Sequence, residues 1–212
     1  MKALIIGATG ATGKDLTRLL LADADYKQVV LFVRRTTGIS HPRLTEIITD
    51  FEQLDTVSEA INGDVWFSCL GTTLKVAGTQ DKQWHIDYDI PAKFAGIAKR
   101  NGVASTVLLS AYGASATSRV FYSRMKGKLE EYLDSLAFEQ YIIFKPGMLL
   151  RQDTERSGER IMGRLLKLLN GLGIAKKFRP MPTALLAEKL AAAPKTLGPG
   201  KHVIELDKIF GF

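Results

Sequence analysis

The sequence predicts an α/β protein built around a doubly wound parallel sheet. Short apolar runs alternate with stretches of helical periodicity up to about residue 150, which is typical of right-handed βαβ crossovers. The first apolar run, residues 1–6, leads directly into three glycines spaced three residues apart, Gly7, Gly10 and Gly13, and then into leucines at helical spacing. A hydrophobic content of 46% is enough for the core of a soluble globular domain.

The remaining elements follow from the same two patterns. The expected further strands are 29–33, 44–48, 65–70, 106–109 and 141–144. The expected helices between them are 51–61, 84–101 and 122–136. Beyond residue 147 the alternation stops, and the pattern predicts helices over 161–169 and 181–192 and a last strand over 203–206. We therefore expect a dinucleotide-binding core, residues 1–150, and a small C-terminal substrate or lid segment, residues 151–212, integrated with it.

Length and composition restrict the class of protein. The 212 residues suit one domain with a modest appendage, and no stretch approaches the roughly 18 apolar residues of a membrane span. The single cysteine, Cys69, lies in the apolar run 65–70, which indicates a buried, reduced thiol. These observations favour a cytoplasmic protein. The three histidines are scattered and suggest no metal site.

The glycine turn is the strongest functional signal, because strand, glycine turn and helix together form a pyrophosphate-binding unit. Gly7 is suited to the tight turn, Gly10 to close approach of backbone N–H groups to the phosphates, and Gly13 to close packing of the helix on the strand. A phosphate-loop nucleotide hydrolase is the competing interpretation. Ala8 stands where that loop requires its first glycine, and Asp15 stands where it requires a Mg²⁺-binding hydroxyl, which argues against it.

The end of the second strand indicates the cofactor. NAD-binding sites usually place Asp or Glu there, about 20 residues past the glycines, to bind the ribose 2′-hydroxyl. This chain has Arg34 and Arg35 instead, and guanidinium groups suit a 2′-phosphate, which favours NADP(H) over NAD(H). Asp50 and Phe51 would border the adenine, and the 71–73 segment would pass under the cofactor.

Three residues predict acid–base chemistry. Ser110 ends the fifth strand, and Tyr122 and Lys126 stand four residues apart on the next helix, which places both on one face. A nearby ammonium group favours the phenolate form of a tyrosine and so makes proton exchange feasible near neutral pH. Tyr141 and Lys145 have the same spacing, but on an expected strand they would lie about 13 Å apart. Only the helical pair can therefore act together, with Ser110 positioned to hydrogen-bond a substrate carbonyl.

With these residues in view, the chain resembles the atypical short-chain dehydrogenase/reductases, NAD(P)-binding Rossmann proteins, in the group of the HIV Tat-interacting oxidoreductase. The resemblance covers nearly the whole length. The segments that carry it are 7–13 (GATGATG), 34–35 (RR), 50–52 (DFE), 69–73 (CLGTT), 108–110 (LLS), 122–127 (YSRMKG) and 146–150 (PGMLL).

The resemblance implies NADPH binding, with Ser110, Tyr122 and Lys126 at the catalytic positions. The residues expected to bind the cofactor are Gly7, Thr9, Gly10, Ala11, Thr12, Gly13, Arg34, Arg35, Asp50, Phe51, Leu70, Gly71, Thr72, Thr73, Lys126, Pro146 and Gly147. The family's fourth catalytic residue, an asparagine, has no clear counterpart on the long helix, where Asp87 and Asp89 are the polar candidates.

The function expected from the sequence is that of an NADPH-dependent oxidoreductase that reduces the carbonyl of a small molecule. The alternative is a regulatory protein that binds NADPH without significant turnover. The net charge of +7 is concentrated in residues 151–179, which hold eight basic and three acidic residues. No recognition motif accompanies them and Phe178 is the one aromatic residue among them, so a lid that attracts an anionic substrate is favoured over nucleic-acid binding. Exposed helix faces of such folds often pair, which leaves a homodimer open.

Overall fold

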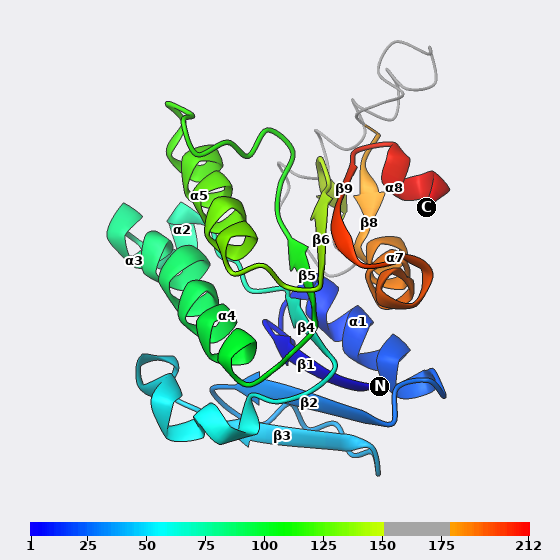
Figure 1. Ribbon diagram of the computed structural model, residues 1–212. Coiled ribbons are helices and arrows are strands. Elements are labelled where there is room, and N and C mark those ends of the chain that lie inside the picture. The colour runs from blue at the N-terminus through cyan, green and yellow to red at the C-terminus, as the bar shows by residue number, and fades with distance from the viewer. Residues whose placement is uncertain (151–178) are drawn as a thin grey trace.

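The computed structural model of the protein describes residues 1–150 and 179–212 (Figure 1). Its centre is a sheet of seven parallel strands in the order β3-β2-β1-β4-β5-β6-β9. The strands are β1 (Lys2–Ile6), β2 (Gln28–Val33), β3 (Leu44–Ile48), β4 (Val65–Ser68), β5 (Ser105–Leu109), β6 (Gln140–Lys145) and β9 (Gly200–Glu205). The strand order reverses direction between β1 and β4, and ligands of doubly wound proteins bind at such a point, beyond the carboxyl ends of the strands. The predicted fold class is confirmed.

Helices cover both faces of this sheet (Figure 1). On one face lie α1 (Ala11–Ala22), α7 (Thr183–Thr196) and the short α8 (Lys208–Gly211). The other face carries the 3₁₀ segment η1 (Phe51–Ala60), α4 (Ile90–Arg100) and α5 (Phe121–Ser135). Further short elements are α2 (Leu74–Ala77), α3 (Gln80–Trp84), the π-helical turn η2 (His85–Asp89), β7 (Leu149–Leu150) and β8 (Met181–Pro182).

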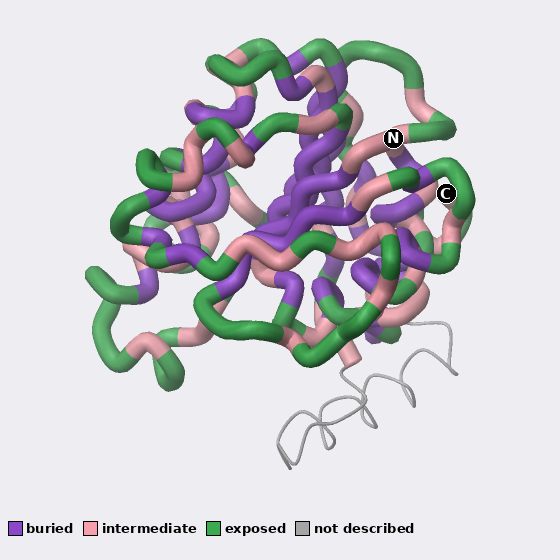
Figure 2. Tube along the Cα trace, turned by 90° about the horizontal axis from the view of Figure 1, so that it is seen from below, coloured by how far each residue is buried: buried purple, intermediate pink, exposed green. Residues whose placement is uncertain are grey.

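The strands divide the hydrophobic core into two layers because successive side chains point to opposite faces. In β1, Ala3 and Ile5 belong to the layer under α1 and α7, whereas Leu4 and Ile6 belong to the layer under α4 and α5. Parallel strands covered on both faces are apolar along their whole length, which explains the unbroken apolar runs in the sequence. Figure 2 shows these buried strands through the middle of the molecule, surrounded by partly exposed helices.

The described residues from 179 onward complete the sheet. Strand β9 pairs with β6 in parallel register, from Gln140 opposite Gly200 to Lys145 opposite Glu205. Helix α7 packs on α1, and the Thr183 hydroxyl donates a 2.8 Å hydrogen bond to the Asp15 carboxylate. The expected helix over 161–169 and the basic lid segment lie outside the described residues, apart from Arg179.

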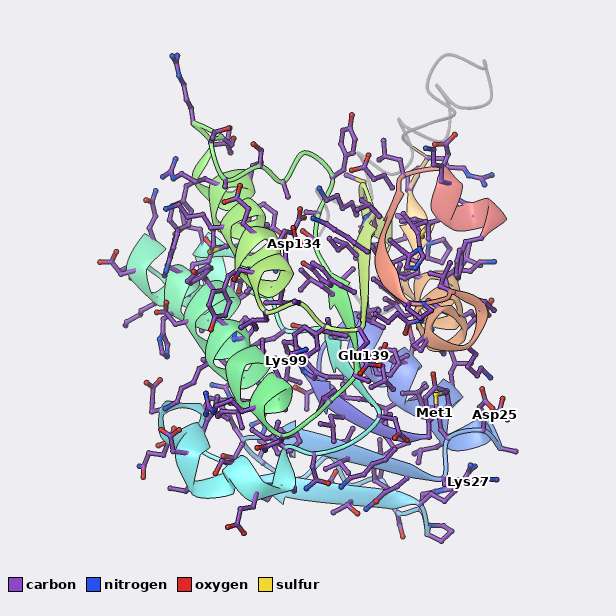
Figure 3. The ribbon with its side chains drawn as sticks, viewed as in Figure 1. Met1, Asp25, Lys27, Lys99, Asp134 and Glu139 are labelled. Atoms are coloured by element: carbon purple, nitrogen blue, oxygen red, sulfur yellow. The ribbon has the colours of Figure 1, made fainter. Side chains whose placement is uncertain are left out.

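The chain start is fastened to the amino ends of the central strands (Figure 3). The Met1 amino group donates a 2.5 Å hydrogen bond to the carbonyl of Asp25, and the Lys27 N–H donates one of 2.8 Å to the carbonyl of Met1. On the α4 side, Lys99 donates to the carbonyl of Ala137 at 2.6 Å. The amino ends of the strands are thus closed by backbone contacts, and the carboxyl ends remain for a ligand.

Two expected helices differ from the structure in their form. The predicted helix over 84–101 begins at Gln80 and contains the π-helical turn η2 before it continues as α4. The predicted helix over 51–61 is a 3₁₀ segment, η1, with non-helical dihedral angles at Gln53. The remaining expected strands and helices agree with the structure to within a few residues at each end.

Candidate functional site

A pocket of about 660 Å³ lies at the carboxyl ends of β1, β4 and β5. The turn after β1, the segment after β4, the residue after β5 and the first turns of α5 form its walls. Its lining residues are Gly10, Ala11, Thr12, Cys69, Leu70, Gly71, Thr72, Thr73, Leu74, Gln80, Gln83, Leu109, Ser110, Val120, Phe121, Tyr122, Lys126 and Leu149. The volume is in the range of small-molecule and cofactor sites.

The turn between β1 and α1 is held by close backbone contacts that only glycine permits. Gly7 has a φ of +81°, in the left-handed region. A methyl group on Gly13 would lie 2.2 Å from the carbonyl oxygen of Gly7, so the first turn of α1 can press directly on the end of β1. Helix α1 begins after Gly10 with no side chain capping its free N–H groups. These N–H groups open into the pocket, where an anion would satisfy them.

The end of β2 presents two arginines to solvent. Arg34 and Arg35 are both exposed and directly follow the strand. The next residues are fastened to β3, because the Thr36 hydroxyl and the Thr37 N–H donate to the Glu46 carboxylate at 2.6 and 3.0 Å. Burial alone would raise the pKa of Glu46, but these hydrogen bonds outweigh it and lower the pKa below its ordinary value. The Glu46 carboxylate therefore binds Thr36 and Thr37 and forms no ion pair with Arg34 or Arg35.

The acid–base residues face the same pocket from β5 and α5. Ser110 directly follows β5 and is 5% exposed, while Lys126 on α5 is 3% exposed. Tyr122 stands one turn before Lys126 and is 39% exposed, at the mouth of the pocket. Burial makes an uncompensated lysine costly, so the groups around Lys126 decide what it can do.

A buried carboxylate accompanies Lys126. Asp87 lies on η2 with no exposed surface, and its Oδ2 is 3.7 Å from Lys126 Nζ. Its Oδ1 accepts a 2.7 Å hydrogen bond from the Thr72 N–H, and Gln83 donates to the Thr72 carbonyl at 3.2 Å. Burial raises the pKa of Asp87, against the opposing effects of Lys126 and the Thr72 N–H. The segment after β4, η2 and α5 are thus joined beside the pocket.

A second, partly buried carboxylate accompanies Ser110. The Ser110 hydroxyl donates a short hydrogen bond to Glu130 Oε1, and Glu130 lies on α5, four residues after Lys126. Glu130 Oε2 lies 2.9 Å from Lys145 Nζ on β6, and Lys145 is also 3.7 Å from Glu205 on β9. The side chains of Glu130 and Lys145 are 12% and 13% exposed, so this ion pair lies within the protein.

The cysteine in the pocket wall, Cys69, holds its thiol in the protonated, unreactive form. Burial raises the pKa of the Cys69 thiol to about 12, and the nearby Lys126 only partly opposes this. A neutral thiol is a poor nucleophile, so Cys69 contributes to packing.

The pocket brings together part of the set expected from the sequence. Of that set, the lining residues are Gly10, Ala11, Thr12, Leu70, Gly71, Thr72, Thr73, Ser110, Tyr122 and Lys126. Those that do not line it are Gly7, Thr9, Gly13, Arg34, Arg35, Asp50, Phe51, Pro146 and Gly147. Asp50 instead caps η1 by accepting from the Glu52 N–H, and Phe51 is buried in the core under α4.

Several residues of the site have no sequence motif of their own. The apolar wall of Leu74, Leu109, Val120, Phe121 and Leu149 is one such group, and the glutamines Gln80 and Gln83 are another. Asp87 was one of two polar candidates on its helix, and its burial beside Lys126 separates it from Asp89, which is exposed. Glu130 gave no signal, because its partners come from other elements.

The sequence model of a family described as NAD(P)H-binding matches residues 7–175 of the chain. The chain belongs to this family. The matched region contains the glycine turn and every pocket-lining residue. The NAD(P)H-binding family model therefore spans the whole candidate site.

Curated relatives place the chain more narrowly in this family. It is 36% identical to Protein FMP52, mitochondrial, of Eremothecium gossypii over 161 residues, which cover 74% of this chain and 71% of the relative. It is 37% identical to Protein HTATIP2 of Rattus norvegicus over 161 residues, covering 73% and 66%. The FMP52 protein of Saccharomyces cerevisiae is 32% identical, covering 84% and 79%. The resemblance inferred from the sequence is therefore confirmed.

Solved structures share the fold of the family. MoeE5 in complex with UDP-glucuronic acid and NAD matches with a TM-score of 0.74 at 15% identity, covering 97% of this chain and 76% of that one. A short-chain dehydrogenase/reductase superfamily protein from Agrobacterium tumefaciens with bound NAD matches with a TM-score of 0.72 at 15% identity, covering 97% and 77%. At these identities the likeness establishes the Rossmann-like architecture.

The expected cytoplasmic location is wrong on this comparison, because the FMP52 relatives are named mitochondrial. The expectation depended on the reduced thiol of Cys69, which separates reducing from oxidising compartments but does not separate one reducing compartment from another. As for membranes, none of the helices within residues 1–150 and 179–212 combines the length and apolar character needed to cross one.

Proposed function

We propose that this protein is an NADPH-dependent reductase that acts on the carbonyl group of a small molecule. The observation that carries the proposal is that one pocket joins the uncapped N-terminus of α1 to Ser110, Tyr122 and Lys126. The first part suits a pyrophosphate, and the second suits proton transfer to a carbonyl oxygen. A chain that only needed to bind a nucleotide would have no use for the second part.

The residues of the pocket fit a dinucleotide. The N–H groups at the start of α1 would hold the pyrophosphate, and Gly71 leaves the floor beside Lys126 open because it has no side chain. Arg34 and Arg35 are the candidates to bind a 2′-phosphate. When bound, NADPH supplies the hydride that reduces the carbonyl carbon.

The side chains of the protein would supply the proton and the orientation. Tyr122 would donate its hydroxyl proton to the carbonyl oxygen, and the Lys126 ammonium would stabilise the phenolate that remains. Asp87 would keep Lys126 charged and in place within the protein, because a buried ammonium group needs a partner. The apolar wall would exclude water from the reacting groups.

The test is Tyr122→Phe, which removes the proton donor and keeps the ring. We expect kcat for carbonyl reduction to fall by about 100-fold or more, with the Kd for NADPH changed by less than about twofold. Tyr132→Phe on the same helix, away from the pocket, is the matched control and should keep kcat. Steady-state kinetics and NADPH fluorescence titration measure the two quantities. Full turnover by Tyr122→Phe would contradict the proposal.

A nucleotide-binding regulatory protein is the second candidate. The Asp87 carboxylate close to Lys126 favours it, since a negative charge there reduces the effect of Lys126 on Tyr122. Tight NADPH binding by the wild-type protein without reduction of any member of a broad carbonyl panel would support this candidate over the reductase.

A further inference from the structure

The hydroxyl proton of Ser110 is already committed inside the protein. Ser110 Oγ donates to Glu130 Oε1, and the other carboxylate oxygen of Glu130 faces Lys145 Nζ at 2.9 Å. The three side chains come from the end of β5, the middle of α5 and the end of β6, and all are at least partly buried. The contact is therefore built into the joint between three elements of the fold.

The direction of each hydrogen bond in this chain is fixed by chemistry. An ammonium group only donates, so Glu130 Oε2 must accept from Lys145. The ion pair balances the charge of Glu130, and an ionised carboxylate has no hydrogen to give, so Oε1 must also accept. Ser110 has a single hydrogen, and it points at Glu130. Only lone pairs of Ser110 Oγ are left for the pocket.

The positions of Glu130 and Lys145 are themselves secured. Lys145 stands opposite Glu205 in the pairing of β6 with β9, and their charged groups are 3.7 Å apart. The Tyr141 hydroxyl donates a 3.2 Å hydrogen bond to the backbone carbonyl of Glu130, which ties this turn of α5 to β6. The carboxylate therefore cannot swing away from Ser110 without breaking contacts on two strands.

We propose that Glu130 is a positioning residue that makes Ser110 a hydrogen-bond acceptor, and that the substrate accordingly carries a hydroxyl group on the carbon beside its carbonyl. This inference rests on the proposed reductase function and gives it a substrate class, α-hydroxy ketones. Tyr122 donates to the carbonyl oxygen, while Ser110 accepts from the neighbouring hydroxyl. An apolar remainder of the substrate would suit Val120, Phe121 and Leu149, which line the same pocket. The role differs from the carbonyl donor that the sequence suggested for Ser110.

Three ketones test the proposal: 2-hydroxyacetophenone, 2-methoxyacetophenone and acetophenone. The methoxy compound keeps the electron-withdrawing oxygen of the hydroxy compound and is larger by one methylene, but it cannot donate a hydrogen bond. For the wild-type protein with NADPH we expect kcat/KM to be roughly tenfold higher for the hydroxy than for the methoxy compound. Thermal stabilisation of the NADPH-loaded Tyr122→Phe protein by each ketone gives the same comparison without turnover.

Glu130→Gln is the decisive variant, because it reverses one hydrogen bond with little change of shape. Lys145 would still require an oxygen, so the Gln amide oxygen would face Lys145 and its NH₂ group would face Ser110. Ser110 would then accept from the amide and donate into the pocket. We expect the preference for the hydroxy compound to fall to about twofold or less, or to reverse. Glu131→Gln, an exposed neighbour on α5, should keep the wild-type preference.

The outcomes separate the inference from the function on which it rests. Reduction of all three ketones by the wild-type protein with equal kcat/KM for the hydroxy and methoxy compounds would overturn the inference and leave the reductase intact. An unchanged preference in a folded Glu130→Gln protein would also overturn it. If no ketone is reduced, the thermal shifts still decide whether the pocket prefers a donor, and the broad carbonyl panel decides the reductase proposal. If Glu130→Gln does not fold, the wild-type comparison decides alone.

Discussion

The two walls of the pocket are built by different means. The wall of β1 and α1 is made of backbone: its close contacts are between Gly7, Gly13 and main-chain atoms, and no charged side chain takes part. The wall of β5 and α5 is made of side chains, and two of its three functional groups have a carboxylate beside them: the buried Asp87 beside Lys126 and the partly buried Glu130 beside Ser110. The shape of the wall formed by backbone can change only if the main chain moves. The charges of the wall formed by side chains can change when a proton is gained or lost.

The largest expected effect is on the backbone wall. Gly13→Ala would put a methyl group 2.2 Å from the Gly7 carbonyl oxygen, so β1 and α1 must separate. We expect the free energy of unfolding to fall by about 3 kcal/mol and NADPH affinity to fall with it. In the matched Gly10→Ala the methyl group lies 3.3 Å from the same oxygen, which should cost less than about 1 kcal/mol. Urea unfolding measures both, and equal losses would contradict the difference.

A smaller effect is expected at the exposed Arg34, which directly follows β2. Arg34→Ala should weaken NADPH binding by roughly tenfold and leave NADH binding within about twofold, because only NADPH carries the 2′-phosphate. Lys27→Ala, just before the opposite end of β2, removes a charge of the same sign away from the pocket and is the control. Parallel calorimetric titrations with the two nucleotides measure the effect. An equal loss for NADH would show that Arg34 does not read the phosphate.

The smallest effect is a change of pH dependence at the charged wall. Burial raises the pKa of Asp87 above its ordinary value of 3.8, so the folded protein holds this proton at pH values where the unfolded chain has released it. The stabilisation is complete below about pH 3.8 and is lost as the pH rises through the raised pKa. In Asp87→Asn the free energy of unfolding should therefore fall less than in wild type as the pH rises from about 3.8 upward.

Asp81→Asn on the exposed side of α3 is the control for this pH dependence, and it should behave as wild type does. Urea unfolding at a series of pH values from about 3.8 upward gives the comparison. If Asp87→Asn kept the full pH dependence of the wild-type protein, the proton would reside elsewhere.

The same contrast explains what the sequence could predict. The backbone wall was predictable because all its parts stand in one stretch, residues 2–22, where strand, glycines and helix each leave a local pattern. The doubly wound parallel sheet followed from the alternation of strands and helices, whereas the order of its strands comes from the structure. The wall of β5 and α5 was not predictable from the sequence, because its contacts join residues far apart in the chain: Asp87 with Lys126, and Ser110 with Glu130 and Lys145. No local pattern connects them.

The turn η2 shows a second limit. Helical periodicity predicted a regular helix through Asp87, and an apolar pattern carries no sign that one turn is π-helical. The extra residue in that turn changes which side chains face α5. Asp50 and Phe51 follow β3 as expected, and in the structure Asp50 caps η1 and Phe51 packs in the core; their contact with the adenine stays a prediction.

The pairing of β9 with β6 has a consequence for how the protein can be shortened. A fragment that stops at residue 150 would keep the glycine turn, Ser110, Tyr122 and Lys126, and would look sufficient on a motif map. It would also strip the neighbour from β6, and the N–H and C=O groups that now bond to β9 would form an open edge. Such an edge recruits other chains, so the fragment would be prone to aggregate while every recognisable motif remained in place.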